Sequence, residues 1–367
     1  MTELAFVIGT VSEAVRLAPV IRACERYEVD HAVIDTGERR FGGVERPLFD
    51  QFDLPAPDIT LDVGTGSHGE QTGMMLAEIE RALVEVDPDT AVVHGDANST
   101  LAGAIAASKM RPEVARVGAG LRSFDRRTSA ETNRVVPDHV ADYLFAPTEK
   151  NRWYLIREGI TELRITVTGS TAVDALDRVR EAGSDEGAVL DDLGLAEDGF
   201  LLMDVHGRTN VDDPDRFRSL LEGAARAGHA HGMEVVYPVQ PRAREQMERF
   251  GVDVPAGVRA IDPQEYAEFV QLLGASAVVL TDSGDVQEEA CILGVPCVTL
   301  RNNTERPETT EIGANRLGQC SPDGINRAVT ESLAAGADWE SPYGDGDAAE
   351  RILDGLPVSV ERGEVVR

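Results

Sequence analysis

Thr281-Asp-Ser-Gly-Asp-Val-Gln-Glu-Glu-Ala-Cys-Ile-Leu-Gly-Val-Pro296 is the stretch of this sequence that best indicates its fold. The apolar run before it, residues 277–280, is typical of a buried parallel strand, and the residues after Ser283 follow a helical pattern that ends at Gly294. A helix that begins behind a strand and a Ser-Gly turn directs backbone N–H groups and the positive end of its dipole at one point. The stretch therefore predicts an anion-binding site with Ser283 and Gly284 in its turn.

Two neighbouring features extend this predicted site. Glu288 and Glu289 stand in the first turns of the expected helix, and a pair of carboxylates there suggests that one of them reaches a ligand hydroxyl group. A second short strand, 298–300, is followed by the polar turn 303–307. Ligands of open α/β sheets bind beyond the carboxyl ends of the strands, so we expect both loops at one ligand-binding edge. Asp282 itself is interpreted as a turn or helix-cap residue.

The whole chain repeats this alternation of strand, polar turn and helix. Strand 4–8 leads to a turn in which Ser12 is the predicted N-cap, strand 90–94 leads to Asp96, and strand 200–204 leads to His206. Alternating strands and helices predict an α/β fold with parallel sheets, and two such halves predict two doubly wound Rossmann-like domains facing a cleft. We place an N-terminal domain at 1–172, a C-terminal domain at 173–345, and a terminal helix and tail at 346–367 that pack back on the first domain.

The charge balance restricts the partners and suggests an environment. The 367 residues include 65 acidic and 35 basic side chains, which give a net charge of −30. Lys109 and Lys150 are the only lysines. This acid excess suggests a halophilic protein that stays soluble at high salt, although an acidic mesophilic enzyme from a GC-rich genome would look similar. No basic stripe is present, so nucleic-acid and anionic-membrane binding are not expected.

The remaining composition predicts a cytoplasmic protein without a metal. The four cysteines form no C-x-x-C pair and are expected to be reduced thiols of the core. No apolar run reaches the roughly 18 residues of a membrane helix, and no signal peptide is expected. No metal-ligand spacing is found.

Several short motifs, taken together and in order, identify a family. The chain resembles the non-hydrolysing UDP-N-acetylglucosamine 2-epimerases, of the glycosyltransferase-B-like fold, over essentially its whole length. The motifs are Gly95-Asp96 with Ser99-Thr-Leu-Ala-Gly103, Ala119-Gly-Leu-Arg122, Asn133-Arg134, Phe145-Ala-Pro-Thr-Glu149, Thr281-Asp-Ser-Gly with Gln287-Glu-Glu, Thr304-Glu-Arg-Pro307, and Gly313 with Asn315-Arg-Leu317.

The resemblance implies an activity and a mechanism. It implies a cytoplasmic homodimer that makes a precursor of surface glycans, needs no cofactor, and holds UDP mainly in the second domain and the sugar against the first, which also forms the dimer. The family inverts C2 of the sugar by removing its proton and expelling UDP, which leaves a glycal to which UDP adds back. Such a reaction needs acid–base groups on both faces of C2 and cationic groups around the leaving diphosphate.

The resemblance also assigns roles to residues of this chain. Asp96 is implied to be catalytic, and His206 is implied to lie at the diphosphate and stabilise the leaving group. Arg16 stands where the family has a lysine. The implied UDP contacts are Ser283 and Gly284 at the phosphates, Glu289 at the ribose, Phe269 at the uracil and Arg306 as a nearby cation.

Several departures put the catalytic half of this assignment in doubt. Val11 stands where the family has an arginine, and Gly118 where it has a catalytic glutamate. A second catalytic glutamate aligns with Ala130, although its neighbour Glu131 could replace it if the loop repositions its side chain.

Three further departures affect binding and regulation. Gln240 replaces a histidine, and Asp285 puts a negative charge beside the phosphates. Residues 38–39, Glu-Arg, replace Gln-His, which makes a regulatory second site doubtful.

Three functions therefore remain open on the sequence. The first is a UDP-N-acetylglucosamine 2-epimerase, or a close variant acting on another UDP-sugar. The second is a nucleotide-sugar hydrolase or a glycosyltransferase on the same fold, which would need fewer acid–base groups at C2. The third is a non-catalytic UDP-sugar-binding partner of a true epimerase.

Overall fold

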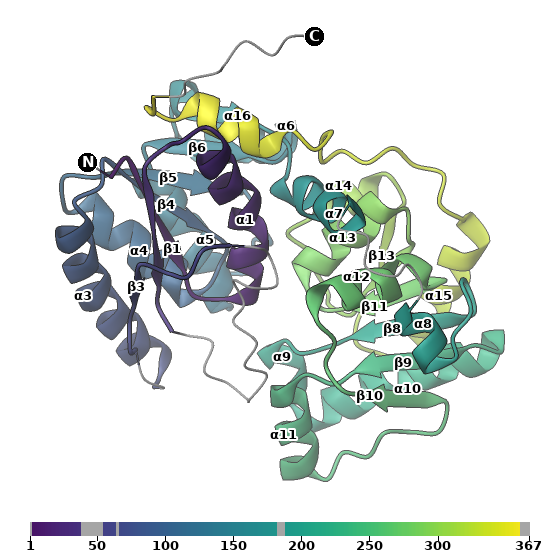
Figure 1. Ribbon diagram of the computed structural model, residues 1–367. Coiled ribbons are helices and arrows are strands. Elements are labelled where there is room, and N and C mark those ends of the chain that lie inside the picture. The colour runs from purple at the N-terminus through teal and green to yellow at the C-terminus, as the bar shows by residue number, and fades with distance from the viewer. Residues whose placement is uncertain (1, 38–53, 64–65, 182–187, 360–367) are drawn as a thin grey trace. The chain divides into compact units, whose positions relative to one another are not determined.

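The computed structural model describes residues 2–37, 54–63, 66–181 and 188–359. The chain forms two compact units, and each contains one parallel sheet covered by helices (Figure 1). Unit 1 comprises Met1–Asp177 and Pro342–Arg367, and unit 2 comprises Arg178–Ser341. The predicted α/β class with two Rossmann-like parallel sheets is confirmed.

Seven strands form the sheet of unit 1, in the order β3-β2-β1-β4-β5-β6-β7, with every described pair parallel. The strands are β1 (Leu4–Ile8), β2 (His31–Asp35), β3 (Ile59–Thr60), β4 (Thr90–His94), β5 (Glu113–Val117), β6 (Tyr143–Ala146) and β7 (Ile165–Val167). The helices are α1 (Val11–Arg26), α3 (His68–Val86), α4 (Asn98–Ser108), α5 (Ser129–Val140), α6 (Glu149–Arg157), α7 (Thr171–Glu181) and α16 (Ala348–Gly355), with a 3-10 turn at Glu162–Arg164.

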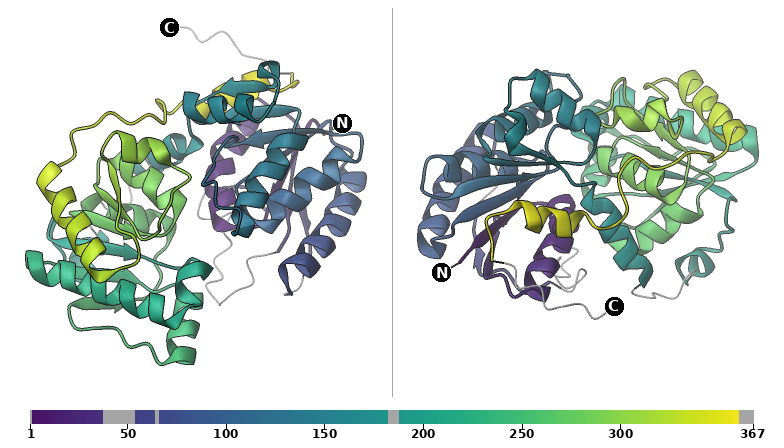
Figure 2. Two further views of the ribbon diagram at one scale, coloured as in Figure 1. Left: turned by 180° about the vertical axis from the view of Figure 1, so that it is seen from behind. Right: turned by 90° about the horizontal axis from the view of Figure 1, so that it is seen from above.

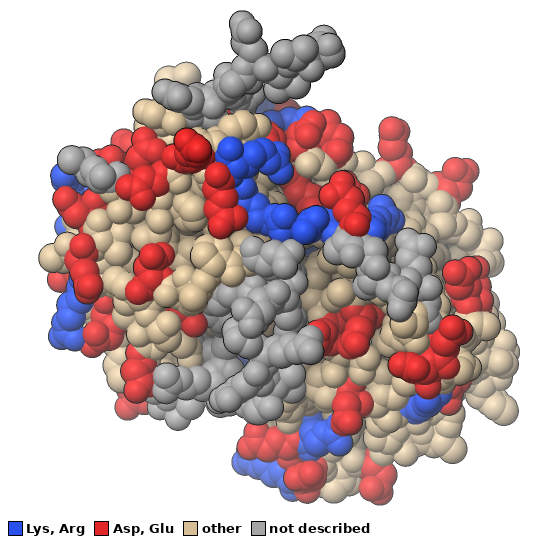
Figure 3. All heavy atoms as spheres, viewed as in Figure 1, with Lys and Arg blue, Asp and Glu red and all other residues tan. Residues whose placement is uncertain are grey.

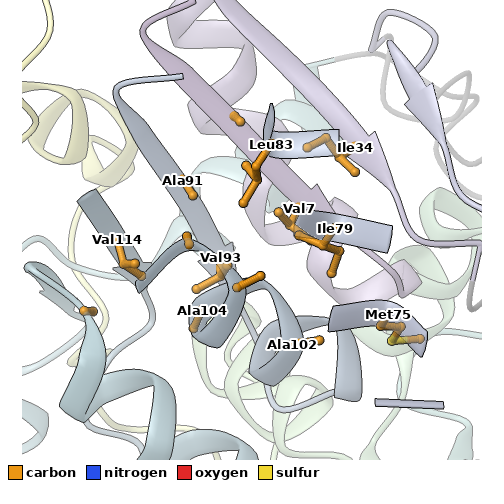
Figure 4. Close-up of a cluster of buried hydrophobic side chains, with 14 of the residues drawn as sticks. Val7, Ile34, Met75, Ile79, Leu83, Ala91, Val93, Ala102, Ala104 and Val114 are labelled. Carbon is orange, nitrogen blue, oxygen red and sulfur yellow. The ribbon is translucent and has the colours of Figure 1, made fainter. Parts of the chain in front are cut away.

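Both faces of this sheet are buried, which explains why β1 is apolar throughout. Leu4, Phe6 and Ile8 pack with α1 and α16 on one face, and Ala5 and Val7 pack with α3 and α4 on the other. Figure 4 shows the second cluster, in which side chains from the strands meet those of α3 and α4.

Unit 2 repeats this arrangement with six strands in the order β10-β9-β8-β11-β12-β13. The strands are β8 (Phe200–Asp204), β9 (Glu234–Pro238), β10 (Val258–Ile261), β11 (Val278–Thr281), β12 (Cys297–Thr299) and β13 (Asn315–Leu317). The helices are α8 (Ala188–Leu193), α9 (Arg208–Val211), α10 (Pro214–His231), α11 (Pro241–Phe250), α12 (Tyr266–Ala275), α13 (Gly284–Leu293), α14 (Pro307–Glu311) and α15 (Pro322–Ala335). Helices α10 and α15 cover one face of the sheet, and α12 and α13 the other.

The last helix, α16, belongs to unit 1 although it follows unit 2 in the chain. It lies beside α1 (Figure 2), with Ile352 and Leu353 in the same cluster as Leu17 and Ile21. Its N-terminus is held by Asp174 of α7, whose Oδ1 accepts from the amide N of Ala349 at 2.9 Å. Burial raises the pKa of Asp174 to about 6.

The prediction of Ser12 as N-cap of α1 was wrong, because Thr10 caps the helix and forms a reciprocal capping box with Glu13. All four cysteines are free thiols, three of them buried. None of the helices in the described parts of the chain is both long and apolar enough to span a bilayer.

The packing of α16 against unit 1 can be tested by truncating one of its buried side chains. Replacing fully buried Ile352 with alanine should lower the free energy of unfolding of unit 1 by about 2–4 kcal/mol, because a cavity opens in its core. The matched control is Leu163→Ala, since the Leu163 side chain is 96% exposed and its truncation should change stability by less than about 0.5 kcal/mol. Urea unfolding followed by circular dichroism measures both, and equal midpoint shifts would contradict this packing.

Candidate functional site

The strand order in unit 2 reverses between β8 and β11, and most of the predicted site residues follow these strands and β12. Ser283 is the N-cap of α13, and its Oγ accepts from the Val286 amide. The helix begins at Gly284 and ends before Gly294, whose φ of 78° is left-handed. The predicted strand, turn and helix are therefore present, with the N-terminus of α13 at the ligand edge of the sheet.

Asp282 joins the two loops at this point and is more than a turn residue. Its buried carboxylate accepts hydrogen bonds from the amide N of His206 (3.2 Å), the amide N of Gly207 (3.0 Å) and Nδ2 of Asn210 (2.8 Å). These donors belong to the loop after β8 and to α9, so Asp282, which lies in the turn after β11, acts over a longer range than the sequence interpretation proposed. The carboxylate fixes the loop that carries His206.

His206 is held by a second buried carboxylate. Its Nδ1 lies 3.2 Å from Oδ1 of Asp204, the last residue of β8, and 45% of the imidazole side chain is exposed. Burial opposes protonation, but the carboxylates of Asp204, Asp282 and Asp285 outweigh it and raise the pKa of His206 to about 10. The histidine is therefore a cation at neutral pH.

Arg306 is buried in ion pairs beside the start of α13. Its Nε lies 2.5 Å from Oε2 of Glu288, and its Nη2 lies 3.2 Å from Oδ1 of Asp285. Asp285, whose negative charge the sequence placed beside the phosphates, thus interacts with Arg306 and also contributes to the raised pKa of His206. The positive charge of Arg306 is partly neutralised by these carboxylates.

A polar and aromatic group lies further along the same helix. Glu289 is buried, and its Oε1 accepts from the hydroxyl of Tyr266 at 3.0 Å. Phe269 stands three residues after Tyr266 on α12 and is half-buried against the core of unit 2. A carboxylate beside an aromatic face is suited to a ribose and a base.

The predicted residues of unit 1 meet at α5. Arg134 is buried, and its Nη2 lies 2.6 Å from Oδ2 of Asp96 while its Nη1 lies 2.8 Å from Oε2 of Glu131. Asn133 donates to the backbone carbonyl of Asp96 at 3.0 Å. The Asp96 side chain is 45% exposed, so its carboxylate is accessible while its position is fixed.

Glu131 has a different environment from Asp96. Its buried carboxylate accepts from the amide N of Ser123 (3.0 Å), Oγ of Ser123 (2.8 Å) and the amide N of Phe124 (2.8 Å), in addition to Arg134. These bonds stabilise Phe124 at a φ of 57°, a left-handed conformation that is costly for a bulky residue. Glu131 therefore fixes the loop after β5.

Glu13 was missed by the sequence reasoning. Its buried carboxylate accepts from the amide N atoms of Gly9 (2.6 Å) and Thr10 (3.0 Å), and from the hydroxyls of Ser99 (2.8 Å) and Thr100 (2.6 Å). It links the loop after β1 to α4 at the point where the strand order of unit 1 reverses. The capping-box spacing of Thr10 and Glu13 is the sequence signal that could have found it.

Arg16 and Gly118, two further positions that the sequence singled out, lie in tightly packed surroundings. Arg16 follows Glu13 on α1, and its side chain is fully buried. Gly118 has a φ of 73°, and a Cβ there would lie 2.8 Å from Cε1 of His94. No glutamate could occupy position 118 unless His94 moved. Residues 38–39 lie outside the described part of the chain.

The candidate residues of the two units differ in their chemistry. Unit 2 presents a helix N-terminus, a histidine cation and a carboxylate beside an aromatic ring, which suit a nucleoside diphosphate. Unit 1 presents an accessible carboxylate that can exchange a proton. Within the described ranges, no group of three or more His, Cys, Asp or Glu side chains is arranged to hold a metal ion.

Comparison with known proteins gives a consistent result. Residues 22–357 match the family model described as UDP-N-acetylglucosamine 2-epimerase. The chain is 41% identical to the UDP-N-acetylglucosamine 2-epimerase of Methanocaldococcus jannaschii, over 96% of this chain and 98% of that protein. It is 38% identical to the UDP-2,3-diacetamido-2,3-dideoxy-D-glucuronate 2-epimerase of Pseudomonas aeruginosa, over 95% and 98% of the two chains.

Solved structures agree with the sequence relatives. The crystal structure of the Methanocaldococcus jannaschii UDP-GlcNAc 2-epimerase in complex with UDP-GlcNAc and UDP superimposes with a TM-score of 0.91 and 40% identity, over 96% of this chain and 98% of that one. The UDP-GlcNAc 2-epimerase from Neisseria meningitidis bound to UDP-GlcNAc gives a TM-score of 0.87 at 28% identity, over 96% and 99%.

The two carboxylates bound by Arg134 should differ in their effect on stability. Glu131→Gln should lower the free energy of unfolding of unit 1 by about 1–3 kcal/mol, because it weakens several buried hydrogen bonds to an ionised acceptor. Asp96→Asn, at a half-exposed position, should cost less than about 1 kcal/mol. Urea unfolding of both variants tests this difference, and a larger loss in Asp96→Asn would contradict it.

Proposed function

The chain belongs to the UDP-N-acetylglucosamine 2-epimerase family, as an isomerase of that family, and on this premise we propose that it interconverts UDP-N-acetylglucosamine and UDP-N-acetylmannosamine. The reaction proceeds by elimination and re-addition of UDP. The observation that carries this proposal is the nucleotide-diphosphate chemistry at one edge of unit 2, in a chain 41% identical over 96% of its length to a protein with that activity.

UDP binding uses the groups at the carboxyl edge of the second sheet. We assign the phosphates to Ser283, Gly284 and the N-terminus of α13, with His206 as the adjacent cation. Glu289 binds the ribose hydroxyls and Phe269 stacks beside the uracil. Arg306 acts through Glu288 and Asp285, which it fixes on the same helix.

At the sugar, Asp96 exchanges the proton of C2. As Asp96 takes this proton, the C–H electrons form the C1–C2 double bond and the C1–O bond breaks, so that UDP leaves with its electron pair. The cation at His206 and the dipole of α13 stabilise the developing diphosphate charge. In the return step the electrons of the C1–C2 double bond take a solvent-derived proton at the other face of C2, and a diphosphate oxygen of UDP re-forms the bond to C1, which completes the inversion.

Arg134 and Glu131 act on Asp96 as positioning residues. The Arg134 guanidinium fixes the Asp96 carboxylate, and Glu131 orients Arg134 while it also fixes the loop 123–124. Both oxygens of Glu131 already accept hydrogen bonds, which supports this role over proton exchange.

The oligomer and the cellular setting are also proposals. We propose a cytoplasmic homodimer, as the family resemblance implies, and multi-angle light scattering would contradict it by giving the mass of one chain. The family also includes a relative that acts on a diacetamido glucuronate. UDP-N-acetylglucosamine is the substrate we favour, because the relative of higher identity acts on it.

The proposed activity predicts the behaviour of an Asp96 variant. Wild-type protein given UDP-N-acetylglucosamine should produce the manno epimer up to an equilibrium mixture, measured by anion-exchange chromatography. Asp96→Asn should lower kcat by about 10²–10⁴, because a group that exchanges the C2 proton is lost. Asp253→Asn, an exposed position in unit 2 with the same change of charge, is the control and should keep its rate.

Two results would contradict this assignment. Full activity in Asp96→Asn would exclude its role as a proton-exchanging residue. No conversion by the wild type of either UDP-N-acetylglucosamine or the diacetamido glucuronate derivative would contradict epimerase activity on both sugars known for these relatives.

We propose that the protein is adapted to high salt. The face in Figure 3 is covered by many more acidic than basic side chains, in agreement with the net charge of −30. Raising KCl from 0.1 M to 1 M shortens the screening length from about 10 Å to about 3 Å.

The melting temperature should therefore rise by at least about 4 °C, because repulsion between carboxylates is screened. The gain should shrink as the pH approaches the sequence pI of about 4.5. A melting temperature that is independent of KCl at pH 7.5 would contradict the adaptation.

A further inference from the structure

We propose that Asp204 is a positioning residue that keeps His206 as a permanent cation at the diphosphate end of the nucleotide site. This inference rests on the proposed function, which assigns His206 to the phosphates of UDP. It adds the charge of the His206 ring and the residue that maintains this charge. It also assigns a purpose to a buried carboxylate that the proposed function does not use.

The geometry fixes both the ring and the carboxylate. Asp204 ends β8 with only 4% of its surface exposed, and its Oδ2 accepts from the hydroxyl of Thr281 on the neighbouring strand at 2.9 Å. Its Oδ1 lies 3.2 Å from Nδ1 of His206, two residues along the chain. Since Nδ1 is used by Asp204, Nε2 is the ring nitrogen available to a ligand.

The charges around His206 favour the imidazolium. Asp204, Asp282 and Asp285 act on it electrostatically, and the carboxylate of Asp282 is held by uncharged amide donors. The arginines nearby have carboxylate partners of their own. Arg306 pairs with Glu288 and Asp285, and Arg301 pairs with Glu305.

The pKa values of both groups follow from this arrangement. The pKa of His206 is raised to about 10, and although burial opposes ionisation of Asp204, the adjacent His206 and the Thr281 hydroxyl lower the pKa of Asp204. Tyr237, whose hydroxyl donates to the Val205 carbonyl, has its pKa raised by burial and remains neutral. The pair Asp204–His206 is thus a carboxylate and an imidazolium at neutral pH.

A fixed cation serves a leaving diphosphate better than a histidine of ordinary pKa. A histidine with a pKa near 6.5 is mostly neutral at pH 7.5 and would offer little positive charge to the diphosphate as the C1–O bond breaks. The imidazolium donates a charge-assisted hydrogen bond to a phosphate oxygen in every cycle. It also stays out of the proton transfers at C2, which leaves them to unit 1.

The test compares UDP affinity with pH in wild type and Asp204→Asn, by titration calorimetry between pH 5.5 and 8.5. The ratio of the two Kd values at each pH cancels the titration of UDP itself. We expect a ratio near 1 at pH 5.5 that rises about tenfold or more by pH 8.5, because His206 in the variant lacks the strongest of the carboxylates that raise its pKa and loses its proton at a lower pH. Asp253→Asn, with the same change of net charge at an exposed site of unit 2, should keep a flat ratio.

Two further measurements assign the effect to His206. In the double variant Asp204→Asn with His206→Gln, the pH step should disappear. In the wild type without ligand, NMR titration should show no change of the His206 imidazole, identified by its loss in His206→Gln, below about pH 8.5. If Asp204→Asn does not fold, Asp204→Ser takes its place.

The outcomes separate this inference from the proposed function. A His206 ring that titrates near pH 6.5 in the wild type, or a flat Kd ratio in Asp204→Asn, would overturn the role of Asp204. Absence of UDP binding by the wild type at every pH would instead contradict the proposed function, while the NMR titration would still decide the charge of His206.

Discussion

A buried carboxylate placed where the strand order of a sheet reverses is the interaction on which the candidate residues of each unit depend. Glu13 does this in unit 1 and Asp282 in unit 2. Glu13 accepts from main-chain N–H groups of the loop after its own strand β1 and from hydroxyl groups of α4, which follows the neighbouring strand β4. Asp282 accepts from main-chain N–H groups of the loop after the neighbouring strand β8. Loops at this point of a sheet present backbone N–H groups to a ligand. If no carboxylate held these loops beforehand, they would have to become ordered when the ligand binds, which would weaken binding. The carboxylates order these loops during folding.

Buried carboxylates also hold the charged side chains of the two units in place. Arg134 and Arg306 are each buried between two carboxylates, and His206 lies against Asp204. Burying such groups costs desolvation free energy, and the pairs therefore contribute more to geometry than to stability. In the reaction we propose, their benefit is a set of oriented dipoles and charges that need no reorganisation when the C1–O bond breaks.

The sequence predicted the fold and the local part of the site, because both depend on short-range patterns. Buried parallel strands are apolar throughout, and the N-cap Ser283 and the C-terminal Gly294 mark α13. The sequence did not predict β13, since Asn315–Leu317 is short and polar and acquires its strand conformation from β12. Nor did the sequence identify the distant hydrogen-bond partners of Asp282, which are 72–76 residues away along the chain, or those of Glu13, which are 86–87 residues away. The order of the strands brings these partners close in space.

Proton NMR of UDP-N-acetylglucosamine incubated with the protein in D₂O at molar KCl would show the reaction itself, because elimination and re-addition must exchange the proton of C2 with solvent. We expect deuterium at C2 of the manno product and, as reversal proceeds, of the gluco substrate, with traces of UDP and glycal. A manno epimer that retains the original C2 proton, or UDP released without any epimer, would contradict the proposed reaction.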